Sequence, residues 1–578
     1  MSHSIRPRSS GDRYKWVALS NTTLGVLVVT IDSTITIVAL PDIFRGIRLD
    51  PLSPGNSFYL LWLILSYLVA EAVLMVSVGR LGDIYGRARI YSLGFVVYTL
   101  GSVLLSITWM TGQSGALWLV LLRVVQGVGG AFLIANAGAI LTDAFPVRQR
   151  GLALGINNVA AISGSSIGLA LGGILGAVDW RLVFLVSVPV GVTGTIWSYL
   201  ELRDRGVRHR TPIDWWGNLT FAVGLILVMI GVTYGIQPYG HRSLAWTSPS
   251  VLLEMSLGVL LLTVFCLIEM RTPAPMFRLD LLRIRAFVFS TIATFLAALG
   301  RGGLMFMLVI WLQGIWLPLH GYSFSTTPLW AGIYMMPLTA GFLLAGPVSG
   351  ALSDHFGARP FATGGMLTAA FSFFLLELLP IRFAYELFAP LLLLNGLGMG
   401  AFASPNRAAV MNSLPTEHRG AGSGMNAAFQ STAQVISIGI FFTLVIAGLS
   451  GTLSSSVAHG LSISGVPHGV AAKAAALPAV STLFAAFLGY NPIQHMLGTH
   501  ALSLLPRSTV HLLTGRTFFP DLIAPPFAAG LHLAFDFSIG CCFVAAVATW
   551  SAGKRYVYLP SGPAACGQVD GVAVGEQP

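Results

Sequence analysis

GRLGDIYG at residues 79–86 and GALSDHFG at residues 350–357 share the pattern G-x-L-x-D-x-x-G. The first copy begins at Gly79 and the second at Gly350, and each one ends a long apolar segment and begins a short basic turn. A pattern that recurs at the same place in two hydrophobic segments indicates duplication. The repeat therefore predicts a membrane-embedded helical bundle made of two pseudo-symmetric halves.

The residues within each copy suit a turn between two helices. Glycine permits a tight turn and a close approach of helices, and Asp83 stands where a helix N-terminus favours a carboxylate. Arg87 follows Asp83 at i+4. A solvated basic turn is the simpler interpretation, but the presence of two copies favours a latch between the halves. The residues expected to form this cytoplasmic gate are Gly79, Asp83, Gly86, Arg87, Gly350, Asp354 and Gly357.

The composition excludes a soluble protein. Of the 578 residues, 55% are apolar and 9% are charged, whereas soluble domains carry about 25% charged residues. The net charge of +10 then belongs to loops at a membrane surface and does not indicate nucleic acid. The chain has four cysteines without metal or redox spacing and lacks a Walker-type phosphate loop. We therefore expect no metal, no cofactor and no enzymatic activity.

Apolar segments of about 17–25 residues can cross a bilayer as helices. Fourteen such segments are expected, and twelve spans with a re-entrant pair are the alternative. The fourteen lie near residues 16–41, 58–79, 90–109, 116–140, 152–177, 181–200, 214–236, 251–270, 286–312, 328–350, 361–380, 386–411, 424–449 and 529–550.

The distribution of basic residues predicts the orientation. With the N-terminus in the cytoplasm, 21 of the 32 Lys and Arg residues lie on the cytoplasmic side, as the positive-inside rule requires. The basic start of the chain lacks a small-residue cleavage site after a short apolar core, so it does not have the pattern of a signal peptide. We expect a multi-pass protein of the plasma (inner) membrane with both termini in the cytoplasm.

The distance between the two copies predicts an inserted helix pair. The first six segments end at residue 200, so two six-helix halves alone would place the second copy well before Gly350. The offset from Gly79 to Gly350 also aligns Gly127 and Gly129 with Gly398 and Gly400. The expected parts are a tail 1–15, a bundle 16–200, an inserted pair with its loops 201–285, a bundle 286–552 and a tail 553–578.

Within the second bundle, residues 450–528 are rich in Ala, Ser, Pro and His. We expect an irregular extracytoplasmic loop there. The moderately apolar stretch Gly469–Leu488 leaves a re-entrant or interfacial helix as the alternative.

Charged residues that fall well inside the expected spans include Asp32, Glu71, Arg123 and Arg301. Each costs about 2.5–3.5 kcal/mol at a helix centre, so these side chains should face a polar cavity or each other. Structural ion pairs are one interpretation. For Asp32 we favour proton binding, because a desolvated carboxylate can take up and release protons. Arg123 is its expected partner, whereas Glu71 and Arg301 fit either interpretation.

Glycines recur every four residues in the segment 152–177, at Gly164, Gly168, Gly172 and Gly176. All four lie on one face of a helix and form a groove for close backbone packing. We expect this face to act as a hinge or seal against a neighbouring helix.

Further motifs carry a family resemblance. They are Asp32–Pro41 in the first span, Gly79–Arg89, Arg123 with Gln126, Gly127 and Gly129, Trp180–Gly191, and Ile213–Gly217. On these residues the chain resembles the major facilitator superfamily, in particular its fourteen-span drug:proton antiporter branch, from about residue 16 to 450 and again in the last span. Leu169 replaces the proline of the branch's fifth-span motif, and Ser187 replaces an asparagine.

The resemblance implies an all-α fold of two six-helix bundles with an inserted pair and fourteen transmembrane helices. It also implies proton-coupled multidrug efflux, for which we expect proton coupling at Asp32, Arg123 and Glu71. Arg301 and Gln126 are candidates for the substrate cavity. Glu71 and Arg301 depart from the branch pattern. Arg301 is expected to pair with Asp32 or Glu71, or to bind an anionic group of the substrate.

The expected activity is the export of small amphipathic compounds, drugs or toxic metabolites, by alternating access. The expected partners are the substrate, protons and the lipid bilayer, with no nucleic acid, and the chain is expected to act as a monomer. An exporter of one endogenous lipid, siderophore or metabolite is the first alternative. A non-transporting receptor or scaffold is the second, and it predicts that the membrane carboxylates are dispensable.

Overall fold

The computed structural model describes residues 10–553 with short gaps. The gaps are 51–52, 54, 147–148, 205–213, 238, 240–243, 273–274, 276, 415–418, 470, 472–474, 476–477, 490, 494–496, 499–501 and 504. The described elements are helices, and alone or joined end to end they form fourteen spans that are long and apolar enough to cross a membrane. The prediction of an all-α protein with fourteen spans is therefore confirmed.

The N-terminal half supplies the first six spans. Its helices are α1 (Ser10–Gly46), α2 (Asn56–Tyr85), α3 (Arg87–Ser106), α4 (Gly112–Ala144), α5 (Arg150–Val178), α6 (Leu182–Leu185) and α7 (Ser187–Glu201). The short α6 and α7 form the sixth span together.

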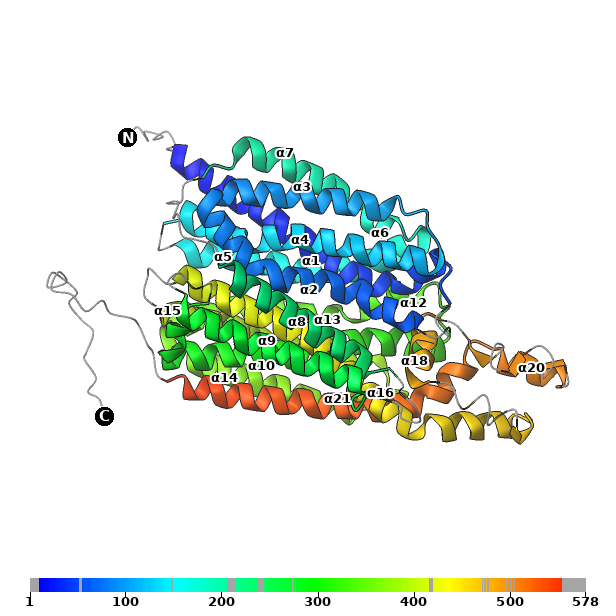
Figure 1. Ribbon diagram of the computed structural model, residues 1–578. Coiled ribbons are helices and arrows are strands. Elements are labelled where there is room, and N and C mark those ends of the chain that lie inside the picture. The colour runs from blue at the N-terminus through cyan, green and yellow to red at the C-terminus, as the bar shows by residue number, and fades with distance from the viewer. Residues whose placement is uncertain are drawn as a thin grey trace, which may run out of the picture.

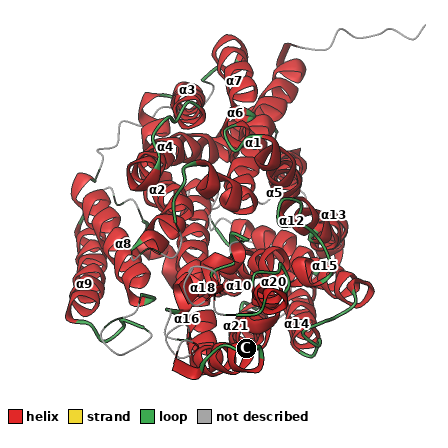
Figure 2. Cartoon of the chain, turned by 90° about the vertical axis from the view of Figure 1, so that its right-hand side faces the viewer, coloured by secondary structure: helices red, strands yellow, loops and turns green. Residues whose placement is uncertain are grey.

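The inserted pair consists of α8 (Trp215–Gly235) and α9 (Pro249–Arg271). Local sequence fixes where both helices begin. The Asp214 carboxylate accepts a hydrogen bond of 2.8 Å from the amide of Gly217, and the Ser248 side chain caps α9 with Pro249 in the first turn. In Figure 2, a view along the helices, the pair stands beside the junction of the two halves, where α8 contacts α2 and α16.

The C-terminal half repeats the arrangement with more interruptions. Its elements are η2 (Leu279–Arg283), α10 (Arg285–Trp311), the π-helical turn η3 (Leu312–Trp316), α11 (Leu317–Leu319), α12 (Thr327–Tyr334), α13 (Met336–Phe356), α14 (Ala358–Glu377), α15 (Tyr385–Asn412), α16 (Arg419–Ile463), α18 (Ala479–Phe487), α20 (Arg507–Leu513) and α21 (Phe518–Ser551).

The long helices run side by side, and α1 begins at the same end of the bundle at which α21 ends (Figure 1). We call this the termini end. The opposite end carries α18 and α20, and we call it the far end. The two turns of the repeated motif join α2 to α3 and α13 to α14, where Gly86 (φ 110°) and Gly357 (φ 86°) end their helices in the left-handed region.

The prediction of an irregular loop over residues 450–528 is wrong for much of its length. α16 continues to Ile463, and its 45 residues span about 68 Å, more than twice a hydrocarbon core of about 30 Å. At the other end of the segment, α21 begins at Phe518. The expected tail after residue 553 lies outside the described residues.

Helix α18 lies within the former loop and is buried over its whole length. The Phe484 ring packs on Phe442, and the Phe487 ring packs on Phe306, with centroids 5.5 and 6.0 Å apart. Its last turn also packs on the π-helical turn, because the backbone of Ala486 closely approaches Gly314. An apolar helix therefore fills the far end of the C-terminal half.

Close glycine contacts within each half show which positions of the two halves correspond to one another. Gly127 of α4 lies against Tyr67 of α2, and Gly396 of α15 lies against Leu338 of α13. The offset from Tyr67 to Leu338 equals the offset between the two motif copies, but the offset from Gly127 to Gly396 is two residues shorter. The alignment of Gly127 and Gly129 with Gly398 and Gly400 is therefore wrong by two residues, because the chain between α13 and this contact of α15 is shorter by that amount.

Candidate functional site

Asp32 lies deep inside the N-terminal half. It is 14 residues before Gly46, the last residue of α1, which is about 21 Å along the helix. Its side chain is fully buried, and Arg123 of α4 is only 1% exposed. The guanidinium of Arg123 forms an ion pair with the carboxylate of Asp32. The structure therefore brings the expected acid and base together in the middle of the bundle.

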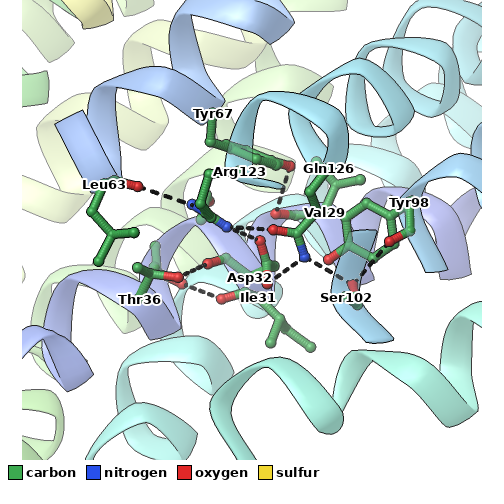
Figure 3. Close-up of polar contacts among 12 residues, drawn as sticks. Val29, Ile31, Asp32, Thr36, Leu63, Tyr67, Tyr98, Ser102, Arg123 and Gln126 are labelled. Carbon is green, nitrogen blue, oxygen red and sulfur yellow. Dashed lines mark hydrogen bonds and ion pairs between the residues drawn. The ribbon is translucent and has the colours of Figure 1, made fainter. Parts of the chain in front are cut away.

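Gln126 completes this network (Figure 3). Its side-chain nitrogen donates to the second carboxylate oxygen of Asp32 at 3.1 Å and to the hydroxyl of Ser102 in α3 at 2.8 Å. Its side-chain oxygen accepts from Arg123 at 2.7 Å. Gln126 follows Arg123 at i+3, so both reach the same carboxylate from one face of α4. Asp32 thus has a charged and a neutral donor.

The remaining surface of Arg123 is covered by α2. Its Nε donates to the Leu63 carbonyl at 3.3 Å, and its guanidinium carbon lies 4.3 Å from the ring centre of Tyr67. The Tyr67 hydroxyl in turn donates weakly to the Val29 carbonyl of α1, at 3.5 Å. A cation over an aromatic face is favourable when both are desolvated. The network therefore joins α1, α2, α3 and α4.

Glu71 lies one turn after Tyr67 on α2 and is half-buried. It lies within electrostatic range of Arg123, and no hydrogen bond or ion pair joins it to another described residue. Of the four predicted intramembrane charges, three therefore belong to one neighbourhood in the N-terminal half.

Arg301 does not join them. It lies on α10, its side chain is exposed, and its guanidinium carbon is 5.5 Å from the ring centre of Phe342 in α13. The expected ion pair with Asp32 or Glu71 is absent among the described residues, because Arg123 occupies Asp32 and belongs to the same half.

The four glycines of α5 face α1. A methyl group on Gly164 would meet Thr30, and one on Gly168 would meet the Ile31 carbonyl. Gly172 lies against Ile35 and Gly176 lies against Ala39 and Asp42. These four glycines, which we call the α5 row, therefore let the backbone of α5 touch the helix that carries Asp32.

We expect Gly172→Ala to destabilise the protein by about 1–3 kcal/mol, as overpacking of a close contact does. The added methyl would lie 2.7 Å from the carbonyl oxygen of Ile35, and neither backbone can move alone. Thermal unfolding in detergent measures the effect. Gly155→Ala, on the same helix with nothing within 4 Å of the added methyl, is the matched control. Equal melting temperatures for the two variants would contradict the packing role.

The first copy of the repeated motif forms a clamp within one half. Arg87 of α3 donates to Asp83 of α2 at 2.9 Å and to both carboxylate oxygens of Asp143 in α4 at 2.8 Å. Gly82 lies against Asn136 of α4. The Arg87 contacts therefore join three helices of the N-terminal half, whereas Arg80 of the same copy donates to the Pro275 carbonyl, between α9 and η2. The latch between the halves stays a prediction.

In the second copy, Gly350 of α13 lies against Ser404 of α15. The Asp354 side chain lies outside the described residues. Arg359, just after the motif, places its guanidinium carbon 3.7 Å from the ring centre of Trp550 in α21. Gly79 has nothing close to the position a side chain would take, so the structure gives it no packing constraint.

We expect Arg87→Gln to lower the stability by about 1–2 kcal/mol, because the ion pairs with Asp83 and Asp143 are lost at a partly exposed site. Melting temperature in detergent measures this loss. Arg87→Lys should not rescue it, since one ammonium cannot bridge both carboxylates in the fork geometry of a guanidinium. Arg89→Gln is the control, as the Arg89 side chain is 73% exposed. An effect of Arg89→Gln as large as that of Arg87→Gln would argue against the clamp.

The two halves meet closely at the far end. Gly332 of α12 lies against the backbone of Leu169 in α5, and Gly173 of α5 lies against Leu329 of α12. Gln313 of η3 donates to the Val38 carbonyl of α1 at 3.4 Å. Towards the termini end, Arg407 of α15 is hydrogen-bonded to Asn158 of α5. The far end is therefore closed by backbone contacts between the halves.

Sequence reasoning missed several members of the network. Tyr67 could have been found, because it lies four residues before Glu71 and so shares its face of α2. Ser102 is one of many helix serines, and nothing in the pattern distinguishes it. Asp536 was also overlooked, although it lies within the expected last span; it is on an exposed face of α21.

Comparison with known proteins assigns this architecture. The model of the Major Facilitator Superfamily matches residues 22–438. The multidrug resistance protein Stp of Mycobacterium tuberculosis (strain CDC 1551 / Oshkosh) is 28% identical over 456 residues, which cover 76% of this chain and 78% of Stp. The riboflavin transporter RibZ of Clostridioides difficile (strain 630) is 26% identical over 74% of this chain and 88% of RibZ.

Solved structures agree on the fold. A bacterial homologue of the human lysosomal transporter Spinster, in an inward-facing and unoccupied conformation, matches with a TM-score of 0.56 and 16% identity over 95% of this chain and 99% of that chain. The xylose transporter XylE from E. coli matches with a TM-score of 0.50 and 14% identity over 75% of this chain and 92% of its own. At these identities the likeness concerns the fold alone.

Proposed function

The chain belongs to the major facilitator superfamily of membrane transporters and is not an enzyme, and we propose that it exports small amphipathic compounds in exchange for protons. The observation that carries the proposal is the buried network of Asp32, Arg123 and Gln126 at mid-membrane depth. A carboxylate in a spanning helix is costly, and such residues commonly belong to proton relays. Relatives named multidrug resistance proteins support the substrate class.

Proton binding at Asp32 changes how α1 is held. The ionised carboxylate is paired with Arg123, and a proton removes the charge that holds this pair together. Arg123 then keeps its bonds to Gln126 and the Leu63 carbonyl, and Glu71 becomes its alternative counter-charge. Protonation therefore loosens α1 from α4, while the contact of Arg123 with α2 is kept.

The α5 row transmits this change to the far end. One face of α5 packs on α1 through Gly168 and Gly172, and the neighbouring Gly173 packs on α12 of the other half. A shift of α1 therefore moves α5, and with it the contact between α5 and α12 that closes the far end. Alternating access would then be a rocking of two rigid bundles, with the proton biasing one state.

The orientation follows from the basic residues. We place the termini end in the cytoplasm and the far end outside the plasma membrane, since the sequence segments expected on the cytoplasmic side hold 21 of the 32 Lys and Arg residues. Protons entering the cell would drive export. One elementary charge that crosses 100 mV releases about 2.3 kcal/mol, which supports a useful concentration ratio.

A vesicle experiment tests the proposal. Proteoliposomes carrying a pH gradient are loaded with fluorescent amphipathic compounds, and transport is followed for the wild type and Asp32→Asn. We expect gradient-driven transport that the substitution abolishes. Asp536→Asn is the matched control, because it removes an acid of a spanning helix that lies outside the network. Transport that ignores both the gradient and the Asp32 substitution would refute proton coupling.

A further inference from the structure

Arg301 is a cation in the middle of the membrane for which the described part of the protein provides no acid. It lies 16 residues after Arg285, the first residue of α10, which is about 24 Å along the helix. Its side chain is exposed and contacts the ring of Phe342. No described residue forms an ion pair or hydrogen bond with it. Such a charge is expensive at this depth unless an anion or water meets it.

Contacts on α16 show which residue of the N-terminal half corresponds in position to Arg301. Ser437 of α16 contacts the Leu299 carbonyl and, at 2.8 Å, the amide of Gly303. In the N-terminal half Gly168 of α5 meets α1 in the same way, at Ile31 and Thr34. The offset from Gly168 to Ser437 equals that from Gly127 to Gly396, and with this offset Arg301 takes the place of Asp32.

The facing helix has changed accordingly. At the same offset, Leu392 of α15 replaces Arg123, and Asn395 replaces Gln126. Leu392 is buried and apolar, so it cannot neutralise a charge. At these three positions the N-terminal half has a carboxylate, a guanidinium and an amide. The C-terminal half has a guanidinium and an amide there, and no carboxylate.

Register places Arg301 opposite Asn395. The Asn406 amide of α15 donates to the Ser290 carbonyl of α10 at 3.0 Å. Eleven residues onward along α10 is Arg301, and eleven residues back along α15 is Asn395. Eleven residues make about three helical turns, so both return to the facing sides of the two antiparallel helices, at one level.

Asn395 supplies an independent observation. Its side chain is 2% exposed, and its Nδ2 has no hydrogen-bond partner among the described residues. Buried amide groups are nearly always hydrogen-bonded, and an exception calls for an explanation such as an unseen ligand. Its counterpart Gln126 donates to the carboxylate of Asp32. A carboxylate is therefore the group that is missing at this place in the C-terminal half.

We propose that Arg301 and Asn395 form a binding site for the carboxylate of the substrate, with Phe342 beside its apolar part. The proposal rests on the export function above and specifies its substrate class as amphipathic organic carboxylates. The substrate carboxylate accepts from the guanidinium and from Nδ2, as the Asp32 carboxylate accepts from Arg123 and Gln126. Arg–carboxylate contacts of this kind are strong and directional.

The other buried or spanning charges also favour an anionic substrate over a cationic one. Asp32 is already neutralised by Arg123, so it offers little attraction to a cation. A second exposed arginine, Arg407, lies five residues before the end of α15, about 8 Å from the termini end, and its hydrogen bond goes to the neutral Asn158. Two cations at different depths of the C-terminal half attract anions from that side.

Equilibrium binding without any gradient tests the site. Purified protein in lipid nanodiscs is titrated with radiolabelled 2-naphthoate, with 2-naphthamide and 2-naphthylmethyl-trimethylammonium as neutral and cationic competitors. We expect naphthoate to bind at least tenfold more tightly than naphthamide and the cation. Arg301→Gln should remove this preference, and Arg301→Lys should keep part of it. Arg271→Gln, at the exposed end of α9, should leave it unchanged.

Asn395→Asp is a second variant that tests the site even if the Arg301 variants fail to fold. It places a carboxylate of the protein next to Arg301, so it should raise the melting temperature and lower the naphthoate affinity more than tenfold. The proposal is overturned if the wild type binds naphthamide or the cation as tightly as naphthoate. It is also overturned if Asn395→Asp folds and leaves the naphthoate affinity unchanged.

Failure here is distinguishable from failure of the export function. Naphthoate binding that depends on Arg301, together with efflux that ignores the pH gradient, refutes proton coupling and supports the carboxylate site. Gradient-driven efflux that selects the cation refutes the carboxylate site and leaves proton-coupled export standing.

Discussion

Replacing Arg123 with methionine is expected to lower the stability by about 3–5 kcal/mol and to abolish export. The substitution keeps most of the side-chain volume but leaves the fully buried carboxylate of Asp32 with Gln126 as its only side-chain donor among the described residues. Removing one partner of a buried ion pair costs about this much, since an uncompensated charge remains inside the protein. The melting temperature in detergent and efflux from vesicles measure the two effects.

A second substitution separates charge from packing. Arg123→Met combined with Asp32→Asn removes both charges, so the double variant should recover most of the lost stability while export stays absent. Arg181→Met is the control, because Arg181 also lies over an aromatic ring, at 4.6 Å from Trp180, but its side chain is 42% exposed. If the double variant were no more stable than Arg123→Met, the loss would come from packing, and the role given to the ion pair would be wrong.

Replacing Gly332 with leucine is expected to abolish transport without unfolding the protein. The Cβ alone would lie 2.6 Å from the carbonyl oxygen of Leu169 in the opposite half. A backbone carbonyl cannot give way as a flexible side chain can, so the far end can no longer close. The protein should stay open at that end, while the contacts within each half remain intact.

Spin labels on α5 and α12, one in each half, measure this opening as a longer far-end distance than in the wild type. Gly346→Leu on α13, where nothing lies within 4 Å of the added Cβ, should transport normally and keep the wild-type distance. A Gly332→Leu protein that still exports, or whose far end still closes, would contradict the assignment of this contact as the closure of the far end.

Position in the chain was enough to anticipate the core of the network. An acid and a base at mid-membrane depth in two spans have few ways to avoid the cost of burial, and pairing is one of them. Asp32 and Arg123 do pair. The spacing of the α5 glycines likewise defined a face before any partner was known, because a four-residue repeat keeps to one side of a helix.

The pairing of Arg301 could not be anticipated in the same way. Its partner depends on how helices of one half face each other, and this register differs by two residues between α13 and α15. The offset between the two motif copies aligns Arg301 with Thr30 and conceals its equivalence to Asp32. Only the contacts of Ser437 and Gly168 with their neighbours remove the ambiguity.

Arg87 and α18 show two other limits. The sequence placed Arg87 near Asp83, but Asp143 lies 56 residues after Arg87 in the chain, so only the folded α4 shows that the contacts of Arg87 stay within one half. The α18 segment has nine residues, too few for a span and too apolar for an exposed loop. Such a short run becomes interpretable once the turn η3 is seen to provide its packing surface.

The most direct test of proton exchange follows the proton itself. Proteoliposomes containing a pH-sensitive dye, with no initial pH gradient, receive an outwardly directed gradient of the amphipathic substrate. For the wild type we predict that protons enter the vesicles as the substrate leaves and that the lumen becomes more acidic, whereas Asp32→Asn leaves the luminal pH unchanged. Substrate efflux from wild-type vesicles without proton entry, or equal proton entry with Asp32→Asn, would contradict the account.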